Sequence, residues 1–355
     1  MKTYKNLYEE ICSFENLHLA YLKARKGKRY RNEILEFSYN LEENLLKLQT
    51  ELRNQTYKHG SYREFIVCDS KKRLIKAAPF RDRVVHHALC NIIEPIFEKG
   101  FIYDSYACRE GKGTHKAIKR VERFWQSAED SRGLDEKDLY CLQCDVSKYF
   151  DSIDHKTLLA IIKRKIIDGR TLCLIEKIIN SDWHKKVFEN LFEFRFSGIP
   201  IGNLTSQLFA NIYLNELDRF VKHSLREKFY VRYMDDFLIL SFDKRKLQHL
   251  KKVIKEFLTD CLALTLHPKK ANIFPISKGI DFLGYRIFRQ YKLLRKSTVR
   301  RFVKRTKRFR KKLQGGKMAE KKFDDSVRSW LTYAKFGDTR GLLKDMRLII
   351  CGRAL

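Results

Sequence analysis

The spacing of apolar residues near the N-terminus predicts helices. In the stretch LEFSYNLEENLLKLQTEL, apolar side chains recur every three or four residues, at Leu41, Leu45, Leu48 and Leu52. Neither Gly nor Pro interrupts this stretch, and the recurrence matches one face of an α-helix. We therefore expect an N-terminal helical segment over residues 1–60.

A change in the pattern after this segment predicts a β-hairpin. The stretch YREFIVCDSKKRLIKAAPF holds two apolar runs around a polar Asp-Ser-Lys-Lys turn, so the hairpin has a basic tip. Helical periodicity returns in RDRVVHHALCNIIEPIFEKG, which ends at Gly100. It returns again in GKGTHKAIKRVERFWQSAE, where Thr114 is the expected N-cap. Because GKGT lacks the full GxxxxGK[ST] pattern, it does not predict a phosphate-binding P-loop.

Short strands alternate with helices through the middle of the chain. LYCLQCD predicts a strand that ends at Asp145, and a helix is expected over 155–167. FRFSGIP predicts a further strand, which a loop and a long helix from about Thr205 follow. FYVRYMDDFLILSF predicts two strands joined by a two-residue turn.

The C-terminal third continues with a helix, a hairpin and a basic helical segment. LQHLKKVIKEFLTDCLALTL is amphipathic, and GIDFLGYRIFRQYKLL predicts a hairpin. From residue 295 onward the chain is basic and helical, with a break at Gly315 and Gly316. The order of all these elements predicts an α+β fold in which a few antiparallel strands are surrounded by helices.

The charge of the chain indicates the class of its partner. Lysine and arginine outnumber aspartate and glutamate by 74 to 43, which gives a net charge of +31 in 355 residues. Because this charge is spread along the whole chain, it favours nucleic acid over an anionic membrane surface. No run approaches the ~20 apolar residues of a membrane span. The start, MKTYKNLYEEICSF, lacks the apolar region of a signal peptide, so we expect a cytoplasmic protein.

The nine cysteines do not predict a metal site or a disulfide framework. Their number is odd and they are scattered, as in a chain whose thiols stay reduced. Cys141 and Cys144 form one CxxC, but no second CxxC or CxxH lies nearby to complete a zinc site. We expect both to be buried structural residues.

The acidic doublet in YVRYMDDFLIL predicts a metal site. An Asp-Asp pair by itself is typical of an exposed turn, but Asp235 and Asp236 lie between apolar runs that predict buried strands. Burying two carboxylates costs several kcal/mol unless cations neutralise them. Asp145 ends another buried strand, so three carboxylates meet if the two elements pair in one sheet. Such an oxygen-rich set suits two Mg²⁺ ions about 3.5–4 Å apart, which can drive phosphoryl transfer.

With these motifs in order, the sequence resembles a reverse transcriptase. The stretches that carry the resemblance are CDVSKYFDSIDH, GIPIGNLTSQLFANIYLNELD and YMDD. The resemblance implies a right-hand polymerase, with fingers and an antiparallel-sheet palm over 61–290 and a basic helical thumb over 291–355. It also implies that the protein binds template RNA, the RNA–cDNA duplex and dNTPs.

The loop before the long helix points to a subfamily. Most reverse transcriptases have Pro-Gln-Gly there, whereas this chain has Pro200, Ile201 and Gly202, followed by a Thr-Ser-Gln sequence that ends at Gln207. In this respect it resembles reverse transcriptases of diversity-generating retroelements. That group copies a template-repeat RNA with errors opposite adenine, and it works with an accessory variability protein, a small basic helical oligomer. Retron-like and group II intron-like enzymes remain alternatives, as does a reverse-transcriptase-derived phage-defence or RNA-binding protein.

The resemblance implies roles for single residues. Asp145, Asp235 and Asp236 are expected to be catalytic and to bind metal, with the backbone carbonyl of Val146 as a further ligand. Lys270 is expected to protonate the pyrophosphate leaving group, although an adjacent lysine could serve instead.

Another set of residues is expected to surround the incoming dNTP. These residues are Arg73, Lys71, Phe150, Ile201, Gly202 and Gln207. Arg73 matches the arginine that holds the triphosphate. Phe150 matches the gate that excludes a ribose 2′-hydroxyl, with ordinary core packing as the alternative. Arg109 is expected to contact the template.

Overall fold

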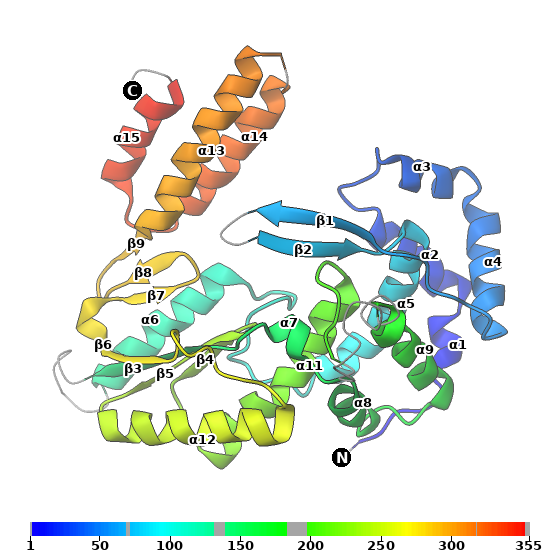
Figure 1. The fold of residues 1–355 in the computed structure, drawn as a ribbon, viewed down its shortest axis with the longest axis horizontal. Helices are drawn as coiled ribbons and strands as arrows, with labels where there is room; N and C mark the ends of the chain where they lie inside the picture. The colour runs from blue at the N-terminus through cyan, green and yellow to red at the C-terminus, as the bar shows by residue number, and fades with distance from the viewer. Residues whose placement is uncertain (1, 69–71, 131–138, 183–196, 317, 352–355) are drawn as a thin grey trace, which may run out of the picture.

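The computed structural model describes residues 2–68, 72–130, 139–182, 197–316 and 318–351 (Figure 1). Helices surround short antiparallel strands, as the sequence patterns predicted. In the view of Figure 1, the N-terminal helices lie on the right, a twisted sheet lies at lower left, and three C-terminal helices lie above that sheet.

The N-terminal segment is helical, as predicted. Its helices are α1 (Tyr8–Ile11), α2 (Phe14–Ala24), α3 (Asn32–Tyr39) and α4 (Leu41–Arg53). They pack around α5 (Phe80–Glu98) through a shared core that includes the three buried leucines of α4. The predicted spacing therefore identified the buried face of α4.

The predicted hairpin is formed by β1 (Arg63–Cys68) and β2 (Lys72–Ala77), which pair antiparallel. Most of its side chains are exposed, and it extends from the N-terminal helices toward the C-terminal ones (Figure 1). The expected basic tip, with Lys71, lies outside the described residues. The helix α6 (Thr114–Asp130) begins at Thr114 itself, so this residue is not the N-cap that we predicted. Its hydroxyl instead donates a hydrogen bond to Tyr233 Oη, at 3.2 Å.

The central sheet has the strand order β4-β5-β3-β6, and every neighbouring pair is antiparallel. The strands are β3 (Tyr140–Asp145), β4 (Tyr230–Tyr233), β5 (Asp236–Ser241) and β6 (Asn272–Pro275). Successive side chains of β5 enter two different cores. Phe237 joins the core shared with α11 (Leu204–Arg219) and α12 (Lys244–Leu262), whereas Leu238 joins the core shared with α6. The sheet is therefore covered on both faces.

The same alternation separates the CxxC cysteines. Cys141 belongs to the core on the α6 face of the sheet and Cys144 to the core on the other face. Both are buried free thiols, so the prediction that they are structural agrees with their positions.

Small helices connect β3 to the hairpin of β4 and β5. They are α7 (Tyr149–Ser152), α8 (His155–Lys163), α9 (Gly169–Ile179) and the 3₁₀ turn η2 (Asn180–Asp182). The helix α8 ends four residues before the predicted limit. The strand predicted from FRFSGIP falls largely outside the described residues. The π-turn η3 (Phe220–Ser224) extends α11, and the 3₁₀ turn η4 (Ile276–Lys278) follows β6.

A second sheet joins the central one to the C-terminal helices. Its strands are β7 (Ile280–Phe282), β8 (Tyr285–Ile287) and β9 (Lys292–Leu294), so three strands occur where we predicted a hairpin. The helices α13 (Lys296–Gln314), α14 (Glu320–Ala334) and α15 (Arg340–Cys351) follow, with the predicted break after α13. Phe302 stacks on Trp330 with ring centroids 3.8 Å apart, which fixes α13 against α14. In the described part of the chain, no helix is long and apolar enough to cross a bilayer.

Candidate active site

The sheet register brings the acidic segments together. Asp145, the last residue of β3, lies opposite Asp236, the first residue of β5. Asp235 occupies the turn between β4 and β5, and its carbonyl accepts a hydrogen bond from Val146 N at 3.3 Å. The three aspartates from two distant segments therefore lie at one end of the central sheet, where the sequence pattern predicted that they would meet.

A buried ion pair supports the turn that carries the doublet. Arg232 of β4 and Asp218 of α11 are both fully buried. Arg232 Nε and Nη2 donate to the two carboxylate oxygens at 2.7 and 2.6 Å, and Tyr230 Oη donates to the same carboxylate at 2.7 Å. The remaining Arg232 Nη1 donates to Met234 O at 3.0 Å, inside the turn. Met234 has a φ of 56°, a left-handed conformation that this hydrogen bond helps to hold.

Sequence reasoning did not identify Arg232 or Asp218. A signal for Arg232 was present, since it is the charged residue of the strand YVRY, whereas Asp218 lies in a helix with several other polar residues. Buried charges of this kind are retained only when they are paired. Arg232 is a positioning residue, because it touches the turn and none of the three carboxylates.

Burial and mutual repulsion raise the pKa of both residues in the doublet. Burial is the largest cause for Asp236, followed by the charges of Asp235 and Asp145, and together they raise its pKa to about 7. The pKa of Asp235 is also raised, first by burial and then by Asp145. Lys270 opposes both shifts, and its Nζ forms an ion pair with Asp145 Oδ2. The site therefore has more negative charge than its surroundings stabilise.

This charge imbalance fits a divalent cation. Carboxylate oxygens are the ligands that hard cations prefer. In the described ranges, no three His, Cys, Asp or Glu side chains are already arranged around a common metal position. The reason is visible at Asp145, whose carboxylate is held by the Lys270 ammonium. Asp145, Asp235 and Asp236 would hold the metal, and the carbonyl of Val146 lies in the same segment.

Removing one of these charges is expected to stabilise the metal-free protein. Asp236→Asn keeps the side-chain shape and eliminates a buried like charge, so we expect a rise in Tm on the order of 2 °C in EDTA. Differential scanning calorimetry measures this shift. Asp260→Asn, on the exposed face of α12, is the matched control and should leave Tm unchanged. A lower Tm for Asp236→Asn would show that the carboxylates are not in repulsion.

Backbone hydrogen bonds connect the residues predicted to surround a nucleotide. Ile199 N donates to Phe150 O at 2.9 Å, which joins the loop before α11 to α7. Lys76 N donates to Ile201 O at 3.0 Å, which joins the same loop to β2. A Cβ on Gly202, which has a φ of 125°, would lie 2.9 Å from Ile75 Cγ2, so glycine permits the close approach. The loop is therefore fixed between two segments that also carry predicted site residues.

Phe150 and Gln207 are both half-buried, and the ring of Phe150 packs against the main core. Arg73 is exposed on β2. Its positive charge is near enough to Asp235 to lower the pKa of that carboxyl. Arg73 and Cys68 line a cavity of about 760 Å³ whose other side is α13, with Arg301, Arg305 and further cations. The exposed hairpin and the basic helix thus face each other across this cavity.

Comparison with known proteins decides the family. The sequence model described as "Reverse transcriptase (RNA-dependent DNA polymerase)" matches residues 58–287, which is more than half of the 355 residues. The chain belongs to the reverse transcriptase family. The matched range contains the hairpin of β1 and β2, the central sheet and the three aspartates, so the prediction from YMDD and its companion motifs is confirmed at this level.

Individual relatives of this reverse transcriptase are similar over part of their length. Protein YkfC of Escherichia coli K12 is 29% identical over 254 residues, which cover 62% of this chain and 65% of that protein. The group II intron-encoded protein LtrA of Lactococcus lactis is 27% identical over 377 residues, which cover 86% of this chain and 60% of that protein. The chain thus spans less than two thirds of both curated relatives. A telomerase structure from Candida albicans aligns over 72% of this chain and 51% of that chain, with 11% identity and a TM-score of 0.49.

The structure does not support the expected template contact of Arg109. This side chain is only 6% exposed and forms an ion pair with Glu98 at 2.6 Å. Its Nη1 also donates to the carbonyls of Ile102 and Ser105, both at 2.7 Å. With its guanidinium used inside the protein, Arg109 shapes the loop before α6 of this reverse transcriptase. Sequence alone could not show this, because the partner lies in a different element.

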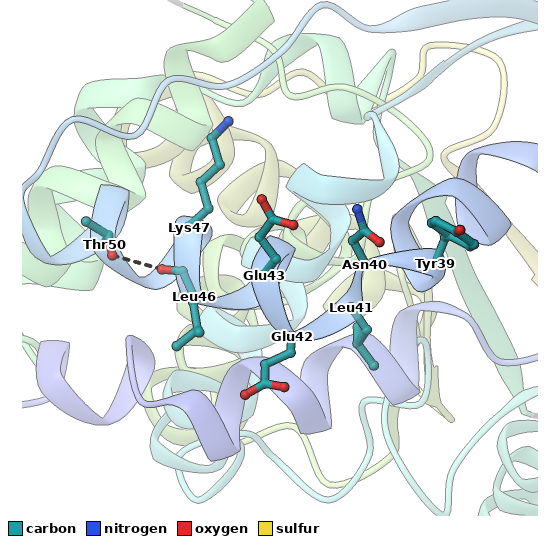
Figure 2. Close-up of a pocket in the computed structure, with 8 residues that line it drawn as sticks. All are labelled: Tyr39, Asn40, Leu41, Glu42, Glu43, Leu46, Lys47 and Thr50. Carbon is teal, nitrogen blue, oxygen red and sulfur yellow. Dashed lines mark hydrogen bonds between the residues drawn. The ribbon is translucent and has the colours of Figure 1, made fainter.

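A separate surface pocket of about 670 Å³ lies on the N-terminal helices (Figure 2). Its lining comes from α4 and from the end of α3, including Tyr39, which is 89% exposed, and the acidic pair Glu42 and Glu43. None of the residues predicted for catalysis or nucleotide binding lines it. This pocket is therefore distinct from the candidate active site.

Proposed function

We propose that this protein is an RNA-directed DNA polymerase that copies an RNA template into cDNA with two Mg²⁺ ions. The observation that carries the proposal is the position of three aspartates at one end of an antiparallel sheet, within the range that matches the family. In this proposal, residues 61–290 form the fingers and palm and residues 291–355 form the thumb. Residues 1–60 are the N-terminal helical segment that supports the fingers.

The three aspartates hold the ions in this proposal, and Val146 adds its carbonyl. Two divalent ions held there would supply activation of the primer 3′-hydroxyl and neutralisation of charge on the triphosphate. We assign Lys270 to the protonation of the leaving pyrophosphate, because its ammonium already lies beside Asp145. The buried pair under the turn keeps the doublet in position for this chemistry.

The segments connected by the loop before α11 would position the incoming dNTP. Arg73 offers a guanidinium that can hold phosphate oxygens bidentately, with Lys71 nearby in sequence. Phe150 would exclude a 2′-hydroxyl, while Ile201, Gly202 and Gln207 would contact the nucleotide. The basic face of α13 supplies cations for the phosphates of the RNA–cDNA duplex.

A primer-extension assay tests this proposal. The purified protein is incubated with a DNA primer annealed to an RNA template, dNTPs and Mg²⁺. We expect full-length cDNA, and no product when EDTA replaces the metal. Failure to extend any primer on an RNA template in the presence of Mg²⁺ would contradict the proposal.

Within this activity, we infer that the enzyme serves diversity-generating retrohoming. Ile201 supports this assignment, because it replaces a glutamine that could hydrogen-bond near the nucleotide. A branched apolar side chain discriminates less between correct and mispaired geometries. The RNA copied would be a template repeat, and the partner would be an accessory variability protein, a small basic helical oligomer. The similarity to LtrA favours a second candidate, a reverse transcriptase of the group II intron type.

Ile201→Gln is expected to raise copying accuracy opposite template adenine. We expect about tenfold fewer errors there, the effect of about 1.4 kcal/mol of added discrimination, and little change opposite the other bases. Sequencing of the cDNA made on an adenine-containing RNA measures both rates. Ile201→Val keeps an aliphatic side chain and should copy with the wild-type error spectrum. Accurate wild-type copying opposite adenine would favour the group II alternative.

A further inference from the structure

A second basic surface lies along α6, and we name it the α6 patch. Its residues line a cavity of about 270 Å³. They are Tyr103, Tyr106, Lys116, Lys119, Arg120 and Arg123. None of these residues has a role in the proposed metal or nucleotide sites. The patch lies beside the β4 edge of the central sheet, because Tyr106 N donates to the carbonyl of Arg232 at 3.0 Å.

The four cations of the α6 patch share one face of the helix. Their positions follow the spacing i, i+3, i+4 and i+7, which places them on neighbouring turns. Lys116, Lys119 and Arg123 are exposed, whereas Trp125 on the opposite face is 1% exposed and packs toward the sheet. Like charges at these spacings repel one another, so the face is stabilised by an external anion.

Internal carboxylates neutralise only part of this charge. The buried Asp104 pairs with Arg120 at 2.6 Å and with Lys222 at 2.9 Å, so its two oxygens are both used. Over the described residues, no carboxylate forms an ion pair with Lys119 or Arg123. These two cations therefore remain available for phosphate.

An exposed aromatic ring completes the α6 patch. Tyr103 is 63% exposed, and Lys112 Nζ lies 3.4 Å from the centroid of its ring. The Arg120 guanidinium lies 5.1 Å from the same ring. Because most of Tyr103 is exposed, its ring offers an apolar surface to a base while neighbouring phosphates contact the cations. Proteins that bind single strands combine stacking and charge in this way.

We propose that the α6 patch binds a single-stranded segment of the template RNA outside the stretch being copied. Duplex RNA hides its base faces, whereas an unpaired base can reach Tyr103. The cavity is below the 300–1,000 Å³ typical of small-molecule sites, so it suits one nucleotide of a longer strand. The inference rests on the proposed function, which supplies RNA as the substrate. Because Tyr106 of the patch is hydrogen-bonded to Arg232 of β4, a strand held here stays next to the hairpin that carries the catalytic doublet.

Fluorescence anisotropy with a labelled 20-nucleotide unstructured RNA tests the inference. We expect Lys119→Glu/Arg123→Glu to raise Kd at least tenfold and to reduce the slope of log K against log salt by about 1.4, since each phosphate contact contributes about 0.7. Tyr103→Ala should raise Kd about tenfold through lost stacking. Primer extension on a template no longer than the copied stretch should stay at the wild-type rate in all of these variants.

The matched control is Lys252→Glu/Lys255→Glu on α12. These two lysines are exposed, and they lie three residues apart along their helix, compared with four for Lys119 and Arg123. An equal rise in Kd for this control would overturn the inference, since it would show a general loss of charge. Unchanged RNA binding by Tyr103→Ala would also overturn it, since the stacking surface would then contribute nothing. A wild-type protein that binds RNA at the α6 patch but extends no primer would refute the proposed function alone.

Discussion

Asp235→Asn is expected to abolish DNA synthesis, lowering the rate of primer extension at least ~10³-fold. The substitution preserves the size of the side chain but removes a charge from the group that holds the metal. Arg232 donates a hydrogen bond to the carbonyl of Met234 in the same turn, so the backbone at Asp235 should keep its position in the variant. Single-turnover extension of a DNA primer on RNA measures the loss.

Two controls separate lost chemistry from lost structure in this variant. Asp260→Asn makes the same chemical change on an exposed face and should extend primers at the wild-type rate. The affinity of Asp235→Asn for the primer–template should stay within about threefold of wild type. If Asp235→Asn retained a tenth of the wild-type rate, the assignment of the doublet as the metal site would be wrong.

Arg232→Met is expected to cost about 3–5 kcal/mol of folding stability. It leaves Asp218 as an uncompensated charge in the core and removes the donor to Met234 O. Chemical denaturation and Tm measure the loss, and primer extension at low temperature should fall as well, because the turn is no longer held.

The double variant Asp218→Asn/Arg232→Met tests the cause of that loss. Neutralising the orphaned carboxylate should recover a substantial part of the stability, because a buried charge costs more than a buried amide. Lys252→Met, which removes an exposed cation, should change stability by no more than about 0.5 kcal/mol. Equal stability of the single and double variants would contradict the electrostatic explanation.

Much of the fold followed from the sequence because its strands and helices have strong periodic patterns. The meeting of β3 and β5 could be predicted because both strands are apolar, and because Asp145 ends β3 while Asp236 begins β5. By contrast, GIDFLGYRIFRQYKLL was predicted as a hairpin but forms three strands, and the three residues of each are too few to show alternation. The strand β9 forms through its register with β8, where Leu293 lies opposite Arg286. This pairing depends on the tertiary structure and cannot be seen in the local sequence pattern.

The candidate site could be predicted only in part for a similar reason. Carboxylates at strand ends are recognisable by residue type, so the convergence of Asp145 and the doublet at one end of the sheet could be predicted. Arg232 and Arg109 show the limit, because the first buried arginine was not singled out and the second was expected to contact the template. Both have their partners in other elements of the structure, and residue type gives no indication of which element that is.

The hydrogen bonds between the main chains of Phe150 and Ile199, and of Lys76 and Ile201, have a consequence for substitutions in this loop. Because backbone atoms form both links, replacing the side chain at any of these positions leaves the links in place. Position 201 can therefore exchange glutamine for an aliphatic residue without detaching its loop from the hairpin or from α7. If position 201 contacts the nucleotide as proposed, exchanging its side chain changes copying fidelity while both main-chain links to the neighbouring segments persist.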